Sequence, residues 1–435
     1  MKFKLLFFAS CFFCMTKIYG QSTYFPPLVG KTWDTVSVQQ LGWCASEIDS
    51  LYNFLGQKNT RAFLLLKDGK IVLEKYFKTF TQDSFWYWAS AGKTLTGFTV
   101  GIAQKQGFLK ITDTSSKYLG TGWTSEPLAK ENLITIRHQL SMSSGLDDGI
   151  SNSDCTDKIC LQYKADAGTR WAYHNAAYTI LDQVVSAATG QAFPQYFYTN
   201  VRNKIGMNGI WYKPDFNNVY YSTPRSMARF GILMLNKGFW NGSAILDDSN
   251  YFKQMTNSSQ IINPSYGYLT WLNGKNSFMT PGLQFVFPGS LCPNAPNDMF
   301  AAEGKNGQIL NVVPSQNVIV IRMGDEPSDN GAVPINFNND LWIYLNKIMC
   351  KTTKVNEVSS SEPLEIYPNP AGETFSVSGI PHDVFVSGKI YDLQGKQCLS
   401  FNQVNQISVS TLETGVYYVL VEFHGQQIRR KLFKP

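Results

Sequence analysis

The sequence predicts an α/β domain followed by a small all-β domain. Strand-like segments lie near both ends of residues 21–351, and helix-like, loop-rich segments lie between them. This order favours one sheet flanked by helices, with the inserted helices forming a separate helical lobe. After Lys351 the chain changes to short alternating β segments separated by turn residues, without a helical pattern. A length of 435 residues is sufficient for both domains.

The first twenty residues have the pattern of a secretory signal peptide. Two lysines precede an apolar run, Leu5–Phe13, that is too short to span a bilayer. Cleavage after Gly20 is the expected processing, and a lipoprotein cysteine at Cys11 is the alternative. No other segment reaches the length of a transmembrane helix. We therefore expect an exported protein with no membrane span.

Periodicity predicts the elements of the α/β domain after an extended lead at residues 21–42. Alternating apolar residues around the Asp68-Gly69 turn indicate a hairpin, and glycines at 190 and 238 mark helix ends. In chain order we expect a helix at 45–55, hairpin strands at 62–66 and 70–77, helices at 94–106, 176–189 and 226–236, strands at 267–272, 309–313 and 317–323, and a helix at 335–348.

The C-terminal part begins after a polar, Ser-rich linker at residues 352–363. Residues 364–435 contain only strand signals and turns, which predicts a small β-sandwich. The expected strands are 374–377, 384–391, 407–410 and 416–423.

The composition excludes several classes of function. The formal net charge is +6, and the basic residues are scattered, so nucleic acid is not an expected partner. None of the four histidines has the spacing of metal ligands. We expect neither a metal site nor another cofactor.

Export also favours disulfides. Six of the eight cysteines remain after removal of the signal peptide. Cys155 and Cys160 lie close together in a loop rich in Ser and Asp, and they form the first expected pair. Cys44 and Cys350 lie near the first and last helices of the α/β domain, so side-by-side packing of those helices would allow a second bridge. The other two cysteines have no evident partner.

Ser90-Ala91-Gly92-Lys93 is the only S-x-x-K in the chain. At a helix start, residues i and i+3 lie on one face, about 5–6 Å apart at Cβ. A neutral amine placed there can take the proton of the hydroxyl, which then attacks a carbonyl carbon. The flanking residues are largely apolar, and burial among them lowers the pKa of a lysine. We predict Ser90 as a nucleophile and Lys93 as its base; a chance pair is the alternative.

Two further segments can complete such a site. Tyr173-His174-Asn175 lies between a turn and a helix start, a usual place for a functional side chain, and a structural tyrosine is the alternative. Residues 300–308 enter a strand with two glycines, which allow close approach of a ligand or another backbone. A plain hairpin turn is the alternative for this segment.

Together these segments resemble the serine β-lactamase and penicillin-binding-protein superfamily, in its branch of class C β-lactamases, D-alanyl-D-alanine carboxypeptidases, esterases and oligoamide hydrolases. Residues 90–93 are similar to its S-x-x-K motif and residues 173–175 to its Y-x-N motif. Ile134–Leu146 and Met227–Leu235 resemble two further blocks. The similarity covers residues 45–348 and implies an antiparallel sheet flanked by helices with an all-helical lobe.

The resemblance also implies roles for single residues. Ser90 would form an acyl-enzyme, with Lys93 and Tyr173 sharing acid–base catalysis. Asn175 would orient Lys93 and the substrate. The backbone N–H groups of Ser90 and Lys305 would bind the oxyanion.

One motif departs from the family pattern. The third motif, K-T-G or a histidine variant, is replaced by Ala302-Glu303-Gly304-Lys305-Asn306-Gly307-Gln308. The basic residue that usually anchors a β-lactam carboxylate is missing, and Glu303 stands near its place. We therefore expect a serine hydrolase that cleaves an ester or amide bond in a small molecule or short peptide. A β-lactamase or D-alanyl-D-alanine carboxypeptidase is the alternative, and a non-catalytic peptidoglycan- or ligand-binding protein is the alternative of another class.

The C-terminal part resembles a different family. Residues 366–370, 390–396 and 415–418, with basic residues at 429–431, are similar to the C-terminal sorting domain of type IX secretion. The resemblance implies the type IX secretion machinery as a partner and a place at the cell surface or outside the cell. A small carbohydrate- or surface-binding module is the alternative.

Overall fold

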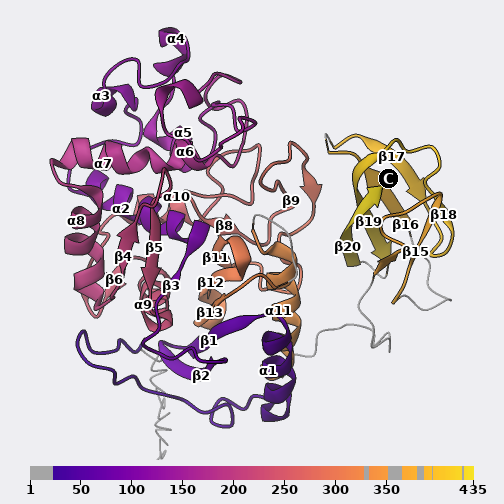
Figure 1. Ribbon diagram of the computed structural model, residues 1–435. Helices are drawn as coiled ribbons and strands as arrows, with labels where there is room; N and C mark the ends of the chain where they lie inside the picture. The colour runs from indigo at the N-terminus through magenta and orange to yellow at the C-terminus, as the bar shows by residue number, and fades with distance from the viewer. Residues whose placement is uncertain (1–22, 328–332, 351–364, 380–386, 394, 424–425) are drawn as a thin grey trace, which may run out of the picture.

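The computed structural model describes residues 23–327, 333–350, 365–379, 387–393, 395–423 and 426–435. The predicted signal peptide and linker lie outside these residues. Two separate apolar cores are present, one between Trp33 and Met349 and the other between Ile366 and Leu432 (Figure 1). The chain therefore has two separately packed parts, in the order that the sequence predicts.

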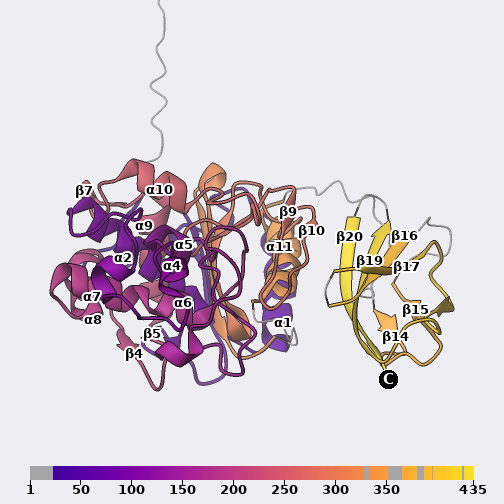
Figure 2. The ribbon, with the colours of Figure 1, turned by 90° about the horizontal axis from the view of Figure 1, so that it is seen from above.

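The larger part is built on a six-stranded antiparallel sheet in the order β2-β1-β13-β12-β11-β8. Its strands are β1 (Thr60–Lys67), β2 (Lys70–Tyr76), β8 (Trp271–Leu272), β11 (Phe300–Gly304), β12 (Gln308–Val313) and β13 (Val318–Gly324). Helices α1 (Ile48–Gln57) and α11 (Ile335–Ile348) lie on one face, and α9 (Pro224–Leu235) covers the other (Figures 1 and 2). Because both faces are covered, every residue of β12 and β13 is buried.

The predicted hairpin of β1 and β2 follows from its turn. Asp68 and Gly69 both have positive φ, 51° and 80°, as a two-residue hairpin loop requires. A side chain at Gly69 would also meet the carbonyl oxygen of Tyr24 at 2.0 Å. Strand β1 also pairs with β13, so the sheet joins residues far apart in sequence.

The helical lobe is inserted between β2 and β8 and packs around α2 (Lys93–Lys105), in which Lys93 to Ala103 are all buried. Its other helices are α3 (Ser116–Leu119), α4 (Leu128–Glu131), α5 (Ile136–Leu140), α6 (Asn175–Thr179), α7 (Leu181–Thr189), α8 (Phe193–Phe197) and α10 (Ser249–Met255). Short helical turns are η1 (Ala45–Glu47), η2 (Ala89–Gly92), η3 (Lys158–Cys160), the π-helical η4 (Tyr198–Arg202), η5 (Asn203–Ile205), η6 (Lys305–Gly307) and η7 (Pro314–Gln316).

Three small sheets complete the larger part. The first has the order β3-β5-β4 and leads directly into η2; the others are β6-β7 and β10-β9. Their strands are β3 (Trp86–Tyr87), β4 (Ile210–Tyr212), β5 (Val219–Ser222), β6 (Phe239–Trp240), β7 (Ser243–Ala244), β9 (Ser277–Phe278) and β10 (Phe287–Pro288).

Several predicted elements have different bounds in the structure. The helix at 176–189 is divided into α6 and α7 at Ile180. Helix α9 begins two residues earlier than expected, because the Thr223 side chain accepts from the Ser226 N–H and Pro224 occupies the first turn. The strand at 267–272 is reduced to its last two residues, because Leu269 has a φ of 50° and the chain turns there.

The C-terminal part consists of two sheets that enclose the second core, as expected for a β-sandwich. One contains β14 (Ile366–Tyr367), β15 (Thr374–Val377) and β18 (Ile407–Ser408), and the other β16 (Ser387–Tyr391), β17 (Gln397–Phe401), β19 (Gly415–Phe423) and β20 (Gln426–Lys434). Strands β14, β17 and β20 were not expected. The basic residues of β20 obscure its strand pattern in the sequence, although the side chain of its Leu432 is completely buried.

Two disulfides are present, with the pairings expected from the sequence. Cys44 is joined to Cys350, with their Cα atoms 5.4 Å apart, and Cys155 to Cys160. The first bridge connects the segment before α1 to the segment after α11, and these two helices pack together. Among the described residues, no helix combines the length and apolar character that a membrane crossing needs.

Candidate active site

Ser90 lies in a tight turn, η2, directly before α2. The preceding residue, Ala89, has a φ of 46°, in the left-handed region that costs a non-glycine residue about 1–2 kcal/mol. Trp88 anchors the turn, because its indole N–H donates to Ser222 Oγ at 2.8 Å and its backbone N–H to Tyr220 O at 2.8 Å. Strain of this kind is common at functional sites, where the surrounding structure holds it.

Ser90 and Lys93 are in direct contact. The Lys93 Nζ donates to Ser90 Oγ at 2.8 Å. The lysine is only 3% exposed, and burial lowers its pKa to about 7. Its Nζ lies 4.1 Å from the ring centroid of Tyr178 and 5.0 Å from that of Tyr173. The S-x-x-K spacing thus places the amine in contact with the hydroxyl, and the lowered pKa lets the neutral form of this amine be populated near neutral pH.

Tyr173 joins the same cluster. Its ring stacks on Trp271 at a centroid distance of 5.8 Å. The nearby Ser90 hydroxyl lowers the pKa of Tyr173, but burial raises this pKa more strongly. The phenol is thus protonated at neutral pH, which suits a proton donor better than a base.

Asn175, the first residue of α6, is held by a neighbouring loop rather than by Lys93. Its Nδ2 donates to Asp154 Oδ1 at 2.7 Å, while its Oδ1 is buried and has no hydrogen-bond partner among the described residues. The Ala176 N–H also donates to Ser153 O at 3.1 Å. Asp154 lies next to the disulfide-bonded Cys155 and raises the pKa of Lys93, in opposition to burial.

The end of β11 lies directly against the Ser90 turn. A Cβ added to Gly304 would be 2.4 Å from Trp88 O and 3.0 Å from Ser90 N. The extended backbone of Gly304 does not itself need a glycine, so the absent side chain is what permits the approach. Lys305 follows this contact, which fits its predicted N–H role beside that of Ser90; its own side chain is exposed.

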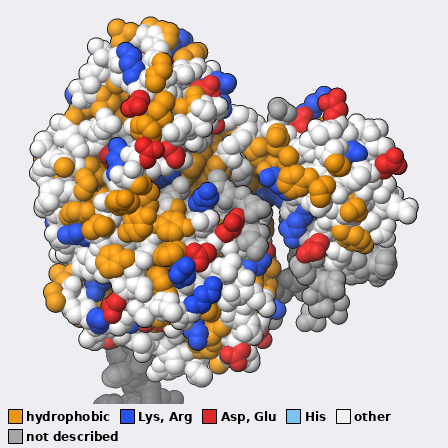
Figure 3. Space-filling view, viewed as in Figure 1, with side chains coloured by type: hydrophobic (Ala, Val, Ile, Leu, Met, Phe, Trp, Pro, Cys, Tyr) orange, Lys and Arg blue, Asp and Glu red, His pale blue; other side chains and the backbone are white. Residues whose placement is uncertain are grey.

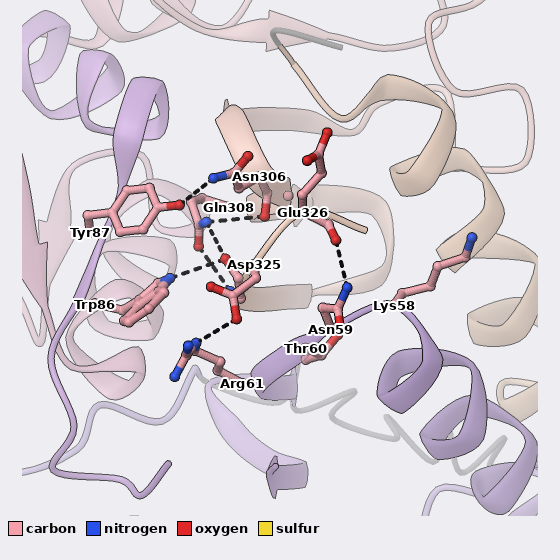
Figure 4. Close-up of polar contacts among 12 residues, drawn as sticks. Lys58, Asn59, Thr60, Arg61, Trp86, Tyr87, Asn306, Gln308, Asp325 and Glu326 are labelled. Carbon is pink, nitrogen blue, oxygen red and sulfur yellow. Dashed lines mark hydrogen bonds and ion pairs between the residues drawn. The ribbon is translucent and has the colours of Figure 1, made fainter. Parts of the chain in front are cut away.

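The turn after Gly304 is fixed from behind by two buried side chains. Arg322 donates to Asn306 O at 2.6 Å and to Gly307 O at 3.0 Å. Gln308 Nε2 donates to Gly324 O at 2.7 Å and to Asn306 O at 3.2 Å. Figure 4 shows Gln308 and Asn306 next to each other in this network. The segment is therefore more than a plain hairpin turn.

Glu303 does not occupy the place of the missing basic residue. It is buried, and its Oε1 accepts from Asn338 Nδ2 on α11 at 2.6 Å. Since side chains alternate along a strand, Ala302 shares the face of Gly304, which lies against Ser90. Next to Ser90, strand β11 thus presents the small residues Ala302 and Gly304, without a cation, on that face.

Sequence reasoning missed three residues of this site: Tyr178, Asp154 and Arg322. Only Tyr178 had a local signal, because it follows Asn175 by three residues on one helix face. Asp154 and Arg322 reach the site through the folding of distant segments. Among the described residues, no group of three or more His, Cys, Asp and Glu side chains is arranged to hold a metal ion.

A serine in contact with a buried lysine at a helix start, beside an antiparallel sheet with a helical lobe, is the arrangement typical of the β-lactamase family of serine hydrolases. The family model described as Beta-lactamase matches residues 56–331, and the chain belongs to this family. The matched segment contains every residue of the candidate site.

Known relatives agree with this fold. An uncharacterized protein of Alkalihalophilus pseudofirmus is 26% identical over 297 residues, covering 59% of this chain and 81% of that protein. A putative β-lactamase from Bacteroides dorei has a TM-score of 0.57 at 17% identity, covering 71% of this chain and 100% of the other. A putative 6-aminohexanoate-dimer hydrolase from Bacillus anthracis has a TM-score of 0.55 at 17% identity, covering 75% and 91%.

The C-terminal part belongs to a secretion family. The model described as Secretion system C-terminal sorting domain matches residues 365–434. This is the sorting domain of type IX secretion, as the sequence predicts, and it indicates export to the cell surface or beyond it.

Proposed function

We propose that the protein hydrolyses an ester or amide bond through an acyl-enzyme at Ser90. The observation that carries the proposal is the 2.8 Å bond between Ser90 Oγ and a buried lysine whose pKa is lowered to about 7. About half of such lysines are neutral at pH 7 and able to accept the serine proton. A non-catalytic binding protein would gain nothing from burying this amine.

The proposed reaction uses residues already in contact. Ser90 Oγ attacks the carbonyl carbon while its proton passes to Lys93 Nζ. The N–H groups of Ser90 and Lys305 bind the oxyanion; one such donor is typically worth about 3–4 kcal/mol. Tyr173 Oη then protonates the leaving group and is reprotonated by the Lys93 ammonium, which returns Lys93 to its neutral form. A water molecule hydrolyses the acyl-enzyme: its oxygen bonds to the acyl carbon, and its proton returns to Ser90 Oγ. Asn175, oriented by Asp154, would contact the substrate through its buried Oδ1.

An ester or amide fits this site better than a β-lactam. Strand β11 presents Ala302 and Gly304 beside Ser90, and Glu303 is bonded to α11, so the strand supplies no cation for a β-lactam carboxylate. The similarity to a putative 6-aminohexanoate-dimer hydrolase, which is named for an amide substrate, points in the same direction.

The test compares Ser90→Ala with Ser84→Ala, a half-buried serine six residues earlier. Both variants and the wild type are treated with a fluorophosphonate probe and assayed with p-nitrophenyl esters, short amide dimers and nitrocefin. Ser90→Ala should lose labelling and at least about a thousandfold in kcat/KM, whereas Ser84→Ala keeps both. Undiminished hydrolysis by Ser90→Ala would overturn the proposal, and hydrolysis of nitrocefin alone would select the β-lactamase alternative.

A further inference from the structure

The outer face of the β3-β5-β4 sheet carries a continuous set of apolar side chains. Tyr87 pairs with Tyr221, Tyr221 pairs with Ile210, and Val219 pairs with Tyr212 across the strands. Because side chains alternate along a strand, these five residues lie on one face of the sheet. We call this set the aromatic face.

The aromatic face is open to solvent. Ile210 and Tyr212 are each 53% exposed, and the other three residues are half-buried. The Tyr221 ring lies 6.2 Å from that of Tyr87 and 6.0 Å from that of Tyr212, so the three rings form a row. Hydrophobic side chains gather over this sheet in Figure 3. Apolar side chains that are contiguous and exposed commonly mark a binding site.

The opposite face of the same sheet explains why the exposure is not a packing defect. Trp211, Tyr220 and Ser222 alternate with the aromatic face and are buried in the main core. Trp211 and Tyr220 pack with their ring centroids 5.1 Å apart. The sheet therefore has a filled core side, and the aromatic face is an additional surface that the fold does not need.

The row of rings begins at the candidate active site. Tyr87 precedes Ser90 by three residues, and its Oη accepts from Asn306 Nδ2 at 2.7 Å (Figure 4). Asn306 follows Lys305, whose N–H is the proposed second oxyanion donor. One end of the aromatic face therefore adjoins both the turn that contains Ser90 and the turn after Gly304.

We propose that the aromatic face binds the apolar, aryl-bearing acyl part of the substrate, as an extension of the site at Ser90. This inference rests on the proposed hydrolase function. The face offers three ring surfaces and two aliphatic side chains, with no carboxylate or basic side chain among the five, so it suits an aromatic or aliphatic group. Binding of such a non-reacting group can be used to lower the barrier of the reaction.

The test measures acyl selectivity with two esters that differ by one aryl group, p-nitrophenyl acetate and p-nitrophenyl 3-phenylpropionate. In Ile210→Ser/Tyr212→Ser, the ratio of kcat/KM for the aryl ester to that for the acetate should fall about tenfold. The control Tyr163→Ser/Ile261→Ser removes two apolar side chains that are 42% and 95% exposed outside this face, and it should keep the wild-type ratio. Circular dichroism and thermal unfolding verify that both variants are folded.

The outcomes separate this inference from the function on which it depends. An unchanged ratio in the folded Ile210→Ser/Tyr212→Ser variant, with Ser90-dependent hydrolysis intact, would overturn the inference and leave the hydrolase proposal standing. Absence of Ser90-dependent hydrolysis in the wild type would overturn both. Sedimentation velocity adds one more readout: a wild-type dimer that the same substitutions dissociate would assign the face to a second copy and overturn substrate binding there.

Discussion

At the scale of single residues, the chemistry depends on two opposing influences on Lys93. Burial among α2 and the rings of Tyr173 and Tyr178 disfavours the ammonium and lowers the pKa of Lys93 to about 7, while the Asp154 carboxylate favours the ammonium and raises it. Only the neutral amine can accept the Ser90 proton. Activity should therefore rise with pH through about pH 7 as the amine loses its proton.

Asp154→Asn should move this rise to lower pH. The amide keeps the size of the side chain but removes the negative charge that stabilises the Lys93 ammonium, so the pKa of Lys93 falls further. The measurement is the acid limb of the pH profile of kcat/KM with a p-nitrophenyl ester. Asp166→Asn is the matched control, because its carboxylate pairs with Lys130 at 2.6 Å on the surface. A shift to higher pH, or equal shifts in both variants, would contradict the assignment.

At the scale of elements, the site depends on how closely β11 approaches η2. Gly304 is the contact, and the atoms that a Cβ would meet are backbone atoms of Trp88, Ser90 and Ala91, which cannot rotate away. Overpacking of this kind typically costs about 1–3 kcal/mol. It would also displace the two proposed oxyanion donors relative to each other.

Gly304→Ala should therefore lower kcat/KM by about a hundredfold and destabilise the fold by about 1–3 kcal/mol. Urea unfolding and ester hydrolysis measure the two effects. The control is Gly56→Ala in α1, where an added Cβ meets only ordinary contacts with Phe77, the nearest at 3.7 Å, and replaces a helical glycine. That variant should keep its activity and gain some stability. Full activity in Gly304→Ala would show that β11 need not approach so closely.

Local elements were the more predictable part of this fold. The hairpin of β1 and β2 follows from alternation and an Asp-Gly turn, and α11 has the predicted bounds, Ile335–Ile348, because its apolar spacing is regular. The turn at Leu269 was not predicted, because it depends on a segment distant in sequence: the Leu269 N–H donates to Leu140 O at 2.9 Å. Strand β20 was not predicted, because its basic residues interrupt the alternation of apolar and polar side chains.

At the scale of the whole molecule, the contacts of the site that lie within one helical turn could be predicted from the sequence, whereas the contacts between distant segments could not. Ser90 and Lys93 are one helical turn apart, so their contact could be predicted from sequence alone. Asp154 reaches Asn175 only because the loop closed by Cys155–Cys160 folds onto the start of α6. Arg322, on β13, reaches the turn after Gly304 from another strand of the sheet. No local pattern could reveal these long-range contacts.

The two disulfides should contribute unequally to the stability of the fold. Cys44–Cys350 closes a loop with a sequence separation of 306, whereas Cys155–Cys160 spans only 5. Because the stabilisation expected from loop closure grows with loop length, Cys44→Ser/Cys350→Ser should lose about 2–5 kcal/mol in urea unfolding while kcat/KM stays within about twofold. Cys155→Ser/Cys160→Ser is the matched control: it should lose less stability, yet it should reduce kcat/KM, because it releases the loop that carries Asp154. Equal destabilisation by both pairs would show that packing of α1 on α11, rather than the covalent bridge, holds the ends of the domain together.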